Sequence, residues 1–377
     1  MRQTALPCLF MRGGTSRGPF FNQDDLPADL ATRDRVLLAA MGSPDKRQID
    51  GLGGAHPLTS KVGIVGKSRR DGIALEFLFA QLQPDKDTVD TTPNCGNMLA
   101  AVVPFALETG LVEAQGRGPD GTSTFRVLTL NTDMACDITV MTPGGQVEYE
   151  GEARIDGVPG HSAPITINFL DTAGSVCDGL LPTGQVKDRI TVEGAGFEPF
   201  TIDVTCIDNG MPLVIFKAAD IGRSGYESVD QLNADTELKT RIEALRLAIS
   251  LKMGLGDVSK KNYPKMTLIA PPRDGGALTT RSFIPHVCHD AIGVLAAVTV
   301  GTACVLEGSV CDGVAVMPAG VTKHVSVEHP TGEFSVALAT DPANPQNVTQ
   351  AALLRTARLL MRGDVMIPGS VWPGKAA

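Results

Sequence analysis

The sequence of 377 residues lacks several features that would assign a protein to a class at once. Its eight cysteines are scattered and form no CxxC pair, so unpaired thiols in a reducing compartment are the simplest interpretation. No basic segment followed by an apolar stretch opens the chain, and no apolar run reaches the roughly 20 residues of a membrane span. We therefore expect a cytoplasmic protein that does not contact a membrane.

An excess of positive charge is also missing, because the formal net charge is -9. An acidic chain is poorly suited to bind nucleic acid or an anionic membrane surface. A small anionic ligand is still compatible with it, since a local group of N–H donors and a few cations can outweigh a diffuse negative surface. The length predicts two domains.

Short β-like segments separated by glycine, proline and aspartate dominate the chain, which is typical of curved or barrel-like sheets. Amphipathic helices are predicted at 29–41, 235–253 and 347–361, and two fully buried helices at 96–110 and 290–307. Ten strands are predicted, at 3–10, 61–65, 73–82, 124–131, 137–141, 165–169, 202–207, 213–217, 266–270 and 325–329.

The two buried helices share the tetrapeptide Leu-Ala-Ala-Val, at 99–102 and 295–298. This likeness predicts two similar halves, each a sheet wrapped around one central helix. The alignment places Cys95 opposite Ala291, so the second half lacks an equivalent thiol. A turn-rich stretch at 181–185 suggests a boundary between domains 1–184 and 185–377, and the last residues could pack back on the first domain.

The run Asn94, Cys95, Gly96, Asn97 directly precedes the first buried helix. A cysteine at a helix N-terminus is favoured as a thiolate, and free N–H groups there favour a bound carboxylate. A buried structural cysteine is the alternative.

Two further motifs in the first half could bind an anion or move a proton. The turn at 11–18 contains Gly14, Thr15 and Ser16, whose backbone N–H groups can form an anion nest. A glycine-rich loop at 48–60 leads through Ser60 to Lys61, which a buried environment could convert into a general base. A plain turn and a solvated surface lysine are the respective alternatives.

The second half contributes a turn at 205–212, with Asn209, Gly210 and Met211, and a segment that leads into the second buried helix. That segment carries His286 and His289, followed by Ala291 and Ile292. No paired His/Cys spacing completes a tetrahedral set, so we predict no metal. The histidines are expected to cap the helix or to contact a substrate carboxylate.

Taken in order, these motifs resemble the PrpF family, a branch of the diaminopimelate epimerase-like fold, over essentially the full chain. The matching motifs are Met-Arg-Gly-Gly-Thr-Ser at 11–16, Pro-Leu-Thr-Ser-Lys at 57–61, Asn-Cys-Gly-Asn at 94–97 and Arg-Thr-Ala-Arg at 355–358. Within the family the likeness is closer to the 4-oxalomesaconate tautomerases and Δ-isomerases. Arg17 and His56 depart from the family pattern, in which lysine and aspartate are usual.

The resemblance implies an α+β fold of two pseudo-symmetric domains with the active site between them. It implies cofactor-free proton transfer on an unsaturated di- or tricarboxylate, with Lys61 and Cys95 as the catalytic pair. Substrate contacts are expected from the other motif residues: Gly14, Thr15, Ser16, Ser60, Asn94, Gly96, Asn97, Asn209, Gly210, Met211, His286, His289, Ala291 and Ile292.

Three functions stay open at this point. The first is isomerisation or tautomerisation of 4-oxalomesaconate in aromatic-acid catabolism. The second is cis–trans or Δ-isomerisation of methylaconitate or aconitate, and the third is a non-enzymatic carboxylate-binding partner of an aconitase-like enzyme. A serine hydrolase is disfavoured because no Gly-x-Ser-x-Gly elbow is present, and a two-cysteine epimerase because Ala291 cannot carry a proton. A histidine in place of the missing thiol, and a homodimer, remain compatible with the sequence.

Overall fold

The computed structural model describes residues 3–170, 172–320, 322–341 and 343–375. The chain divides into two compact units. Unit 1 comprises Met1–Leu170 together with Arg355–Ala377, and unit 2 comprises Asp171–Leu354. The domain boundary expected between residues 184 and 185 stays a prediction.

Unit 1 is built on one sheet that contains both parallel and antiparallel strand pairs. Its strands pair in the order β17, β1, β2, β3, β4, β6, β7, β8, and the short β5 also pairs with β4. The strands are β1 (Gln3–Gly13), β2 (Ser16–Asn22), β3 (Lys61–Lys67), β4 (Leu75–Leu82), β5 (Val89–Asp90), β6 (Thr122–Thr129), β7 (Met134–Met141), β8 (Ile165–Phe169) and β17 (Ala357–Pro368).

The central helical segment of unit 1 is interrupted. Where one buried helix was expected at 96–110, the chain forms α2 (Gly96–Leu99) and α3 (Val102–Glu108). Pro104 has no N–H to donate to the carbonyl of Ala100, so the helical ladder breaks between the two segments. α2 contacts β1, β2 and β3, and α3 contacts β3 and β7, so the sheet curls around both. On the other side, α1 (Leu30–Met41) contacts β5 and β17.

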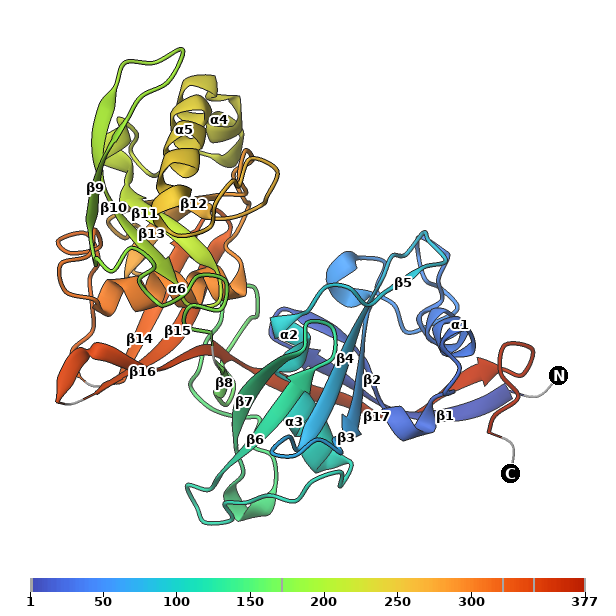
Figure 1. Cartoon of the computed structure of the whole chain (residues 1–377). Helices are drawn as coiled ribbons and strands as arrows, with labels where there is room; N and C mark the ends of the chain where they lie inside the picture. Colours follow the sequence, from blue (N-terminus) through green and yellow to red (C-terminus); the bar gives the residue numbers. More distant parts are fainter. Residues whose placement is uncertain (1–2, 171, 321, 342, 376–377) are drawn as a thin grey trace. The chain divides into compact units, whose positions relative to one another are not determined.

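Unit 2 repeats this plan around one longer helix, α6 (Val294–Val305). α6 contacts β10, β11, β14 and β15 (Figure 1). Its side chains form the centre of a buried apolar cluster. The strands pair in sequence order and are β9 (Asp188–Val192), β10 (Phe200–Asp208), β11 (Pro212–Lys217), β12 (Lys265–Ala270), β13 (Leu278–Phe283), β14 (Thr322–His329), β15 (Gly332–Asp341) and β16 (Asn344–Arg355).

The two units share one pattern of strand directions. From β1 to β8, successive pairs run antiparallel, parallel, antiparallel, parallel, antiparallel, antiparallel. The pairs from β10 to β16 follow the same pattern. In both units the central helix is inserted after the fourth strand of the series. The expectation of two similar halves, each a sheet around a central helix, is confirmed.

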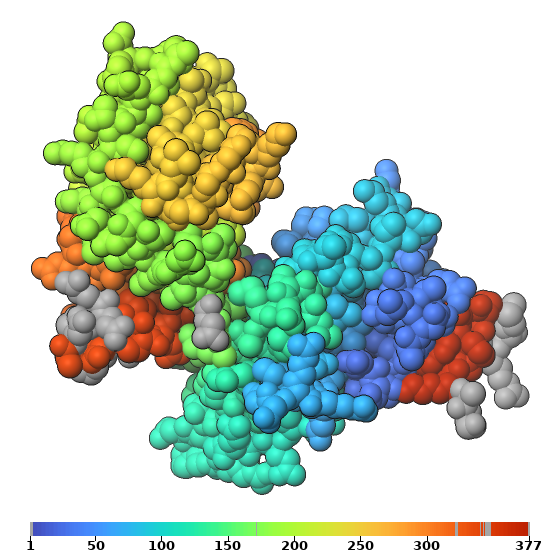
Figure 2. All heavy atoms as spheres, viewed as in Figure 1, coloured from blue at the N-terminus to red at the C-terminus, as the bar shows by residue number. Residues whose placement is uncertain are grey.

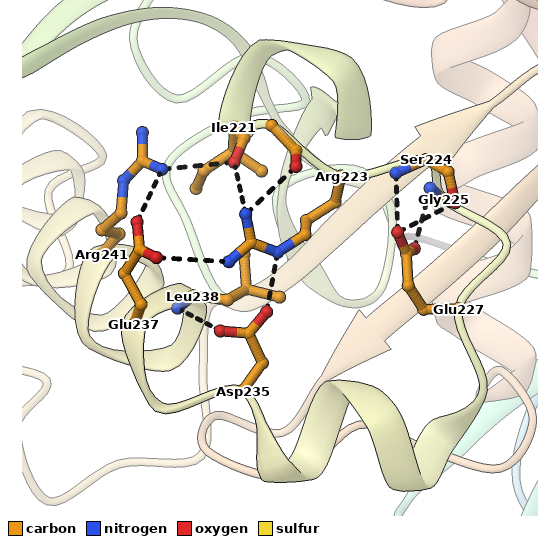
Figure 3. A network of polar contacts seen from close by, with 10 residues as sticks. Ile221, Arg223, Ser224, Gly225, Glu227, Asp235, Glu237, Leu238 and Arg241 are labelled. Atoms are coloured by element: carbon orange, nitrogen blue, oxygen red, sulfur yellow. Dashed lines mark hydrogen bonds and ion pairs between the residues drawn. The ribbon is translucent and has the colours of Figure 1, made fainter.

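Unit 2 also has an outer helical layer, made of α4 (Val229–Ala234) and α5 (Thr236–Lys252). Asp235 caps α5 by accepting the N–H of Leu238 at 2.9 Å, and it pairs with Arg223 at 2.7 Å (Figure 3). Glu237 bridges Arg223 and Arg241 in the same network. The other face of α5 packs on a second apolar cluster, while its solvent side lies on the surface of unit 2 (yellow in Figure 2).

One predicted helix is wrong. Residues 347–361 fall in β16 and β17, separated at Thr356. β17 pairs with β1 from Gln3↔Pro368 to Gly13↔Ala357, and β16 pairs with β15. The partner of β17 lies far away in the sequence, and the pairing of β16 depends on the register of a neighbouring hairpin. The periodicity of the local sequence therefore did not predict these two strands. The predicted strand 165–169 matches β8, and the other predicted strands and helices are present with shifted ends, apart from the split helix described above.

No helix in the described part of the chain combines the length and the apolar character needed to cross a lipid bilayer.

Candidate active site

Lys61 opens β3 and is buried, with 8% of its surface exposed. Its Nζ donates to Oε1 of Gln81 at 2.5 Å and lies 4.8 Å from the centre of the Phe79 ring. Among the described residues no carboxylate forms an ion pair with Lys61. The amine is therefore held by a neutral carboxamide oxygen and lies beside an aromatic ring.

Gln81 is fixed in one orientation. Its Nε2 donates to three backbone carbonyls, those of Pro57 at 3.1 Å, Ser60 at 3.1 Å and Leu82 at 3.0 Å. With its nitrogen held in this way, the carboxamide can present only its oxygen to Lys61. This contact between Gln81 and Lys61 was not predicted from the sequence. The available signal was a glutamine within the apolar run Phe77–Leu82 of β4.

A second buried glutamine organises the glycine-rich loop before Lys61. Gln48 is 1% exposed, and its Oε1 accepts the N–H of Ala55 at 2.9 Å and the hydroxyl of Ser60 at 2.8 Å. Its Nε2 donates to Oγ of Ser43 at 3.1 Å. The Ser60 hydroxyl is thus buried inside the loop, and its expected contact with a substrate stays a prediction. His56 is exposed and accepts the N–H of Leu58 at 3.1 Å.

Cys95 occupies the N-cap position of α2 and is half-buried, whereas the other seven cysteines are buried. Burial raises the thiol pKa of Cys8 to about 11 and that of Cys136 to about 12. All eight cysteines are free. Cys95 is therefore the one cysteine among the eight that is not buried, which favours the functional interpretation over the structural one.

The strand register brings the segment that contains Cys95 close to Lys61. Lys61 pairs with Gln81 across β3 and β4, and Gln81 pairs with Asp90 across β4 and β5. With neighbouring strands about 4.8 Å apart, the Cα atoms of Lys61 and Asp90 are about 10 Å apart. Cys95 follows Asp90 by five residues and begins α2, which itself contacts β3. Both proposed catalytic residues thus belong to one region of unit 1.

Asn131 links two parts of this region through hydrogen bonds, and this role was not predicted from the sequence. Its carboxamide accepts the N–H of Phe79 at 2.9 Å and donates to the carbonyl of Phe79 at 2.8 Å. It also donates to the carbonyl of Thr91 at 2.7 Å. The Asn131 side chain therefore connects Phe79 of β4, whose ring lies next to the Lys61 amine, to the loop that leads to Cys95. Asn94 lies in the same loop, and its Oδ1 accepts the N–H of Cys95 at 2.7 Å.

The turn between β1 and β2 packs directly on α2. Asn97 donates from Nδ2 to Oγ1 of Thr15 at 2.9 Å. Gly14 has φ 51°, and a Cβ added to it would lie 2.2 Å from Oδ1 of Asn97, so only glycine allows this close approach. Ser16 is 2% exposed, and its hydroxyl has no hydrogen-bond partner among the described residues. This buried hydroxyl lies in the β1–β2 hairpin that packs on α2.

The two arginines of this motif have different surroundings. Arg12 donates to the carbonyl of Gly14 at 3.0 Å and to Oγ1 of Thr356 at 2.9 Å, so it supports the turn from within. Arg17 is exposed and stacks over the ring of Phe10 at 5.7 Å. The Arg17 guanidinium also lies next to Gly54 in the glycine-rich loop.

In unit 2, the motif at 205–212 lies against α6. Asn209 is buried, accepts the hydroxyl of Thr172 at 2.6 Å, and donates to Oγ1 of Thr302 at 2.9 Å. Gly210 has φ 93° and packs on Leu295, while Met211 is partly buried against the same apolar cluster. The Asn209 side chain is therefore largely occupied within unit 2, and its contact with a substrate stays a prediction.

The two histidines before α6 lie in different environments. His286 is exposed, and its Nδ1 lies 3.7 Å from Oε2 of Glu243. His289 is half-buried and accepts the N–H of Ala291 at Nδ1, at 2.8 Å. Burial lowers the pKa of His289, and the nearby positive charge of Lys265 lowers it further. Gly293, two residues after Ala291, is the N-cap of α6, and Ile292 is buried.

Comparison with known proteins assigns the chain to a family. The profile of the PrpF protein family matches residues 3–368. The chain is 56% identical to a (4E)-oxalomesaconate Δ-isomerase of Novosphingobium sp., over 96% of this chain and 97% of that protein. It is 51% identical to a 4-oxalomesaconate tautomerase of Pseudomonas putida, over 99% of each chain. The crystal structure of a methylitaconate Δ-isomerase superposes with a TM-score of 0.82 at 32% identity, covering 100% of this chain and 99% of that one.

The fold and these matches define an isomerase of the epimerase-like α+β class. The chain belongs to the PrpF family, as the sequence motifs indicated. Because the similar proteins are isomerases or tautomerases, the enzymatic interpretation is confirmed over a non-catalytic carboxylate-binding partner.

Proposed function

We propose that this protein isomerises 4-oxalomesaconate, or an unsaturated tricarboxylate of the same kind, by moving one proton. Lys61 removes a proton from a carbon that is conjugated to a carboxylate or keto group. The electrons pass into a dienolate, and Cys95 returns a proton at the other end of the conjugated system. No electrons are gained or lost overall, so the reaction needs no net oxidant or reductant.

The observation that carries this proposal is the Lys61 amine itself. It is buried, it is hydrogen-bonded to the neutral Gln81 at 2.5 Å, and it lies in the region of unit 1 that holds the one cysteine that is not buried. A carboxylate partner would stabilise the ammonium form and oppose proton abstraction.

The residues around Cys95 are suited to bind the acid groups of such a substrate. Thr15 and Ser16 lie at the turn between β1 and β2, and Asn97 of α2 donates a hydrogen bond to Thr15. Donors placed before the reaction stabilise the negative charge that develops on the dienolate. Asn94 and Gly96 border Cys95 on either side and complete this proposed binding surface.

Substitution of each member of the pair tests the proposal. Lys61→Met and Cys95→Ala should each lower kcat by at least about 10²-fold, because positioned acid–base groups typically contribute about 10²–10⁴-fold. The assay follows substrate by ultraviolet absorbance and C–H exchange by proton NMR in D₂O. Lys67→Met, at the exposed far end of β3, is the matched control and should keep wild-type turnover. Unchanged kcat in Lys61→Met would exclude Lys61 as the base.

A second candidate is isomerisation of a methylitaconate- or methylaconitate-like acid, which the similarity to methylitaconate Δ-isomerase favours. Both reactions use the same proton transfer, so only the substrate distinguishes them. The higher identity to the oxalomesaconate enzymes supports the first candidate. Purified enzyme offered each acid separately, with products followed by NMR, should show the highest kcat/KM on 4-oxalomesaconate.

A further inference from the structure

The side chains of Lys61 and Gln81 lie on one face of the strand pair β3–β4. The two residues are direct partners in the antiparallel register, so their side chains point to the same side of the sheet. Nζ of Lys61 donates to Oε1 of Gln81 at 2.5 Å. Phe79 precedes Gln81 by two residues on β4 and shares that face, and its ring centre lies 4.8 Å from Nζ. The Lys61 amine is therefore bordered by two side chains of one strand.

The Gln81 carboxamide has one favourable orientation. Three carbonyl oxygens surround its Nε2, those of Pro57, Ser60 and Leu82, at 3.1, 3.1 and 3.0 Å. A carbonyl oxygen accepts hydrogen bonds and cannot donate them, so a flipped carboxamide would place its own oxygen against three acceptors. Oε1 of Gln81 is therefore kept on the side of the Lys61 amine.

The strand that carries Gln81 is itself anchored at this position. Gln81 has a strand partner on each side, Lys61 on β3 and Asp90 on β5. Two residues earlier, the carboxamide of Asn131 accepts the N–H of Phe79 at 2.9 Å and donates to its carbonyl at 2.8 Å. The backbone below the carboxamide is thus held from both edges of β4, which limits how far Oε1 can move.

We propose that Gln81 is the positioning residue of the Lys61 amine during proton transfer. The proposal rests on the proposed function, in which Lys61 is the base. A free lysine side chain populates many rotamers, so one fixed acceptor can select the conformation in which the proton is moved. The alternative is that Gln81 only fastens the segment 57–60 to β4. That role predicts a loss of stability without a specific effect on the Lys61 amine.

Gln81→Met tests this role, because methionine keeps the length of the side chain and removes both the donor and the acceptor. A misplaced base slows the chemical step, so kcat should fall about 10- to 100-fold. KM should stay within about threefold of wild type, since Gln81 acts through Lys61 and not through substrate binding. Gln83→Met is the matched control, because among the described residues the Gln83 side chain forms no hydrogen bond to Lys61, and it should keep the wild-type kcat.

Chemical labelling of lysines gives a second measurement that does not depend on activity. Reductive dimethylation followed by peptide mass spectrometry compares the labelling rate of Lys61 with that of Lys67, the exposed last residue of the same strand. Loss of the hydrogen bond should raise the rate at Lys61 at least about threefold relative to Lys67 in Gln81→Met, and not in Gln83→Met. If Lys61→Met keeps wild-type turnover, the proposed function fails, and labelling still shows whether Gln81 fixes the amine.

Three results would overturn the proposal. The first is wild-type kcat in a Gln81→Met variant that circular dichroism shows to be folded. The second is an unchanged labelling rate of Lys61 in that variant. The third is a loss confined to KM or to the melting temperature, which would leave Gln81 with the fastening of segment 57–60 alone. If the methionine variant does not fold, Gln81→Ala takes its place with the same criteria.

Discussion

Gly18 offers the sharpest test of how accurately the fold must place the Lys61 amine. Gly18 lies on β2 beside the start of β3, and a Cβ added there would lie 1.8 Å from the carbonyl oxygen of Lys61. Ordinary contact begins at 3.4 Å, so Gly18→Ala must separate the two backbones by about 1.6 Å at Lys61. The contact is with backbone on both strands, so no flexible side chain can absorb the change.

This displacement should impair catalysis more than folding. A misplacement of about 1 Å can cost about 10²-fold in rate, equivalent to about 2.7 kcal/mol of transition-state stabilisation. Overpacking typically costs about 1–3 kcal/mol of stability, which a domain with about 5–15 kcal/mol can tolerate. We therefore expect Gly18→Ala to stay folded, with a lower melting temperature, and to lose about 10²-fold or more in kcat.

The assay is proton exchange followed by NMR, with circular dichroism to measure the folded fraction. Gly363→Ala is the control, because Gly363 lies on β17 of the same unit and a Cβ there meets nothing within 4 Å. It should keep wild-type turnover. In a Lys61→Met background, Gly18→Ala should add no further loss, since the two changes act on one group. A folded Gly18→Ala with kcat within about twofold of wild type would refute the reasoning.

Two further predictions concern pH. Gln81→Glu places a carboxylate beside the Lys61 amine and favours the charged form of the amine. The acid limb of the pH profile of kcat/KM should therefore move up by about one to three pH units. Gln83→Glu is the control and should leave the acid limb in place. The hydrogen bond from Arg223 is the main cause that holds the pKa of Asp235 below its unfolded value of 3.8. Asp235 therefore contributes stability that is present above pH 3.8 and is lost as the pH falls through the lowered pKa. Urea unfolding of Asp235→Asn should show a flatter acid dependence than wild type, and Asp220→Asn should not.

Local sequence predicted many elements of unit 1, and the proposed catalytic residues lie at the ends of short strands and at turns. Lys61 follows a glycine-rich loop, and Cys95 precedes an alanine-rich helix, so each was visible in its immediate neighbourhood. Gln81 and Asn131 were missed because their roles come from partners 20 to 52 residues away, through hydrogen bonds to Lys61 and to Phe79. Nothing in the residues around them indicates those partners.

In the rest of the chain, prediction from local sequence was limited because strand pairing depends on distant residues. Residues 347–361 have a helical pattern, yet the chain extends there because β1 and β15 offer unpaired edges that β17 and β16 complete.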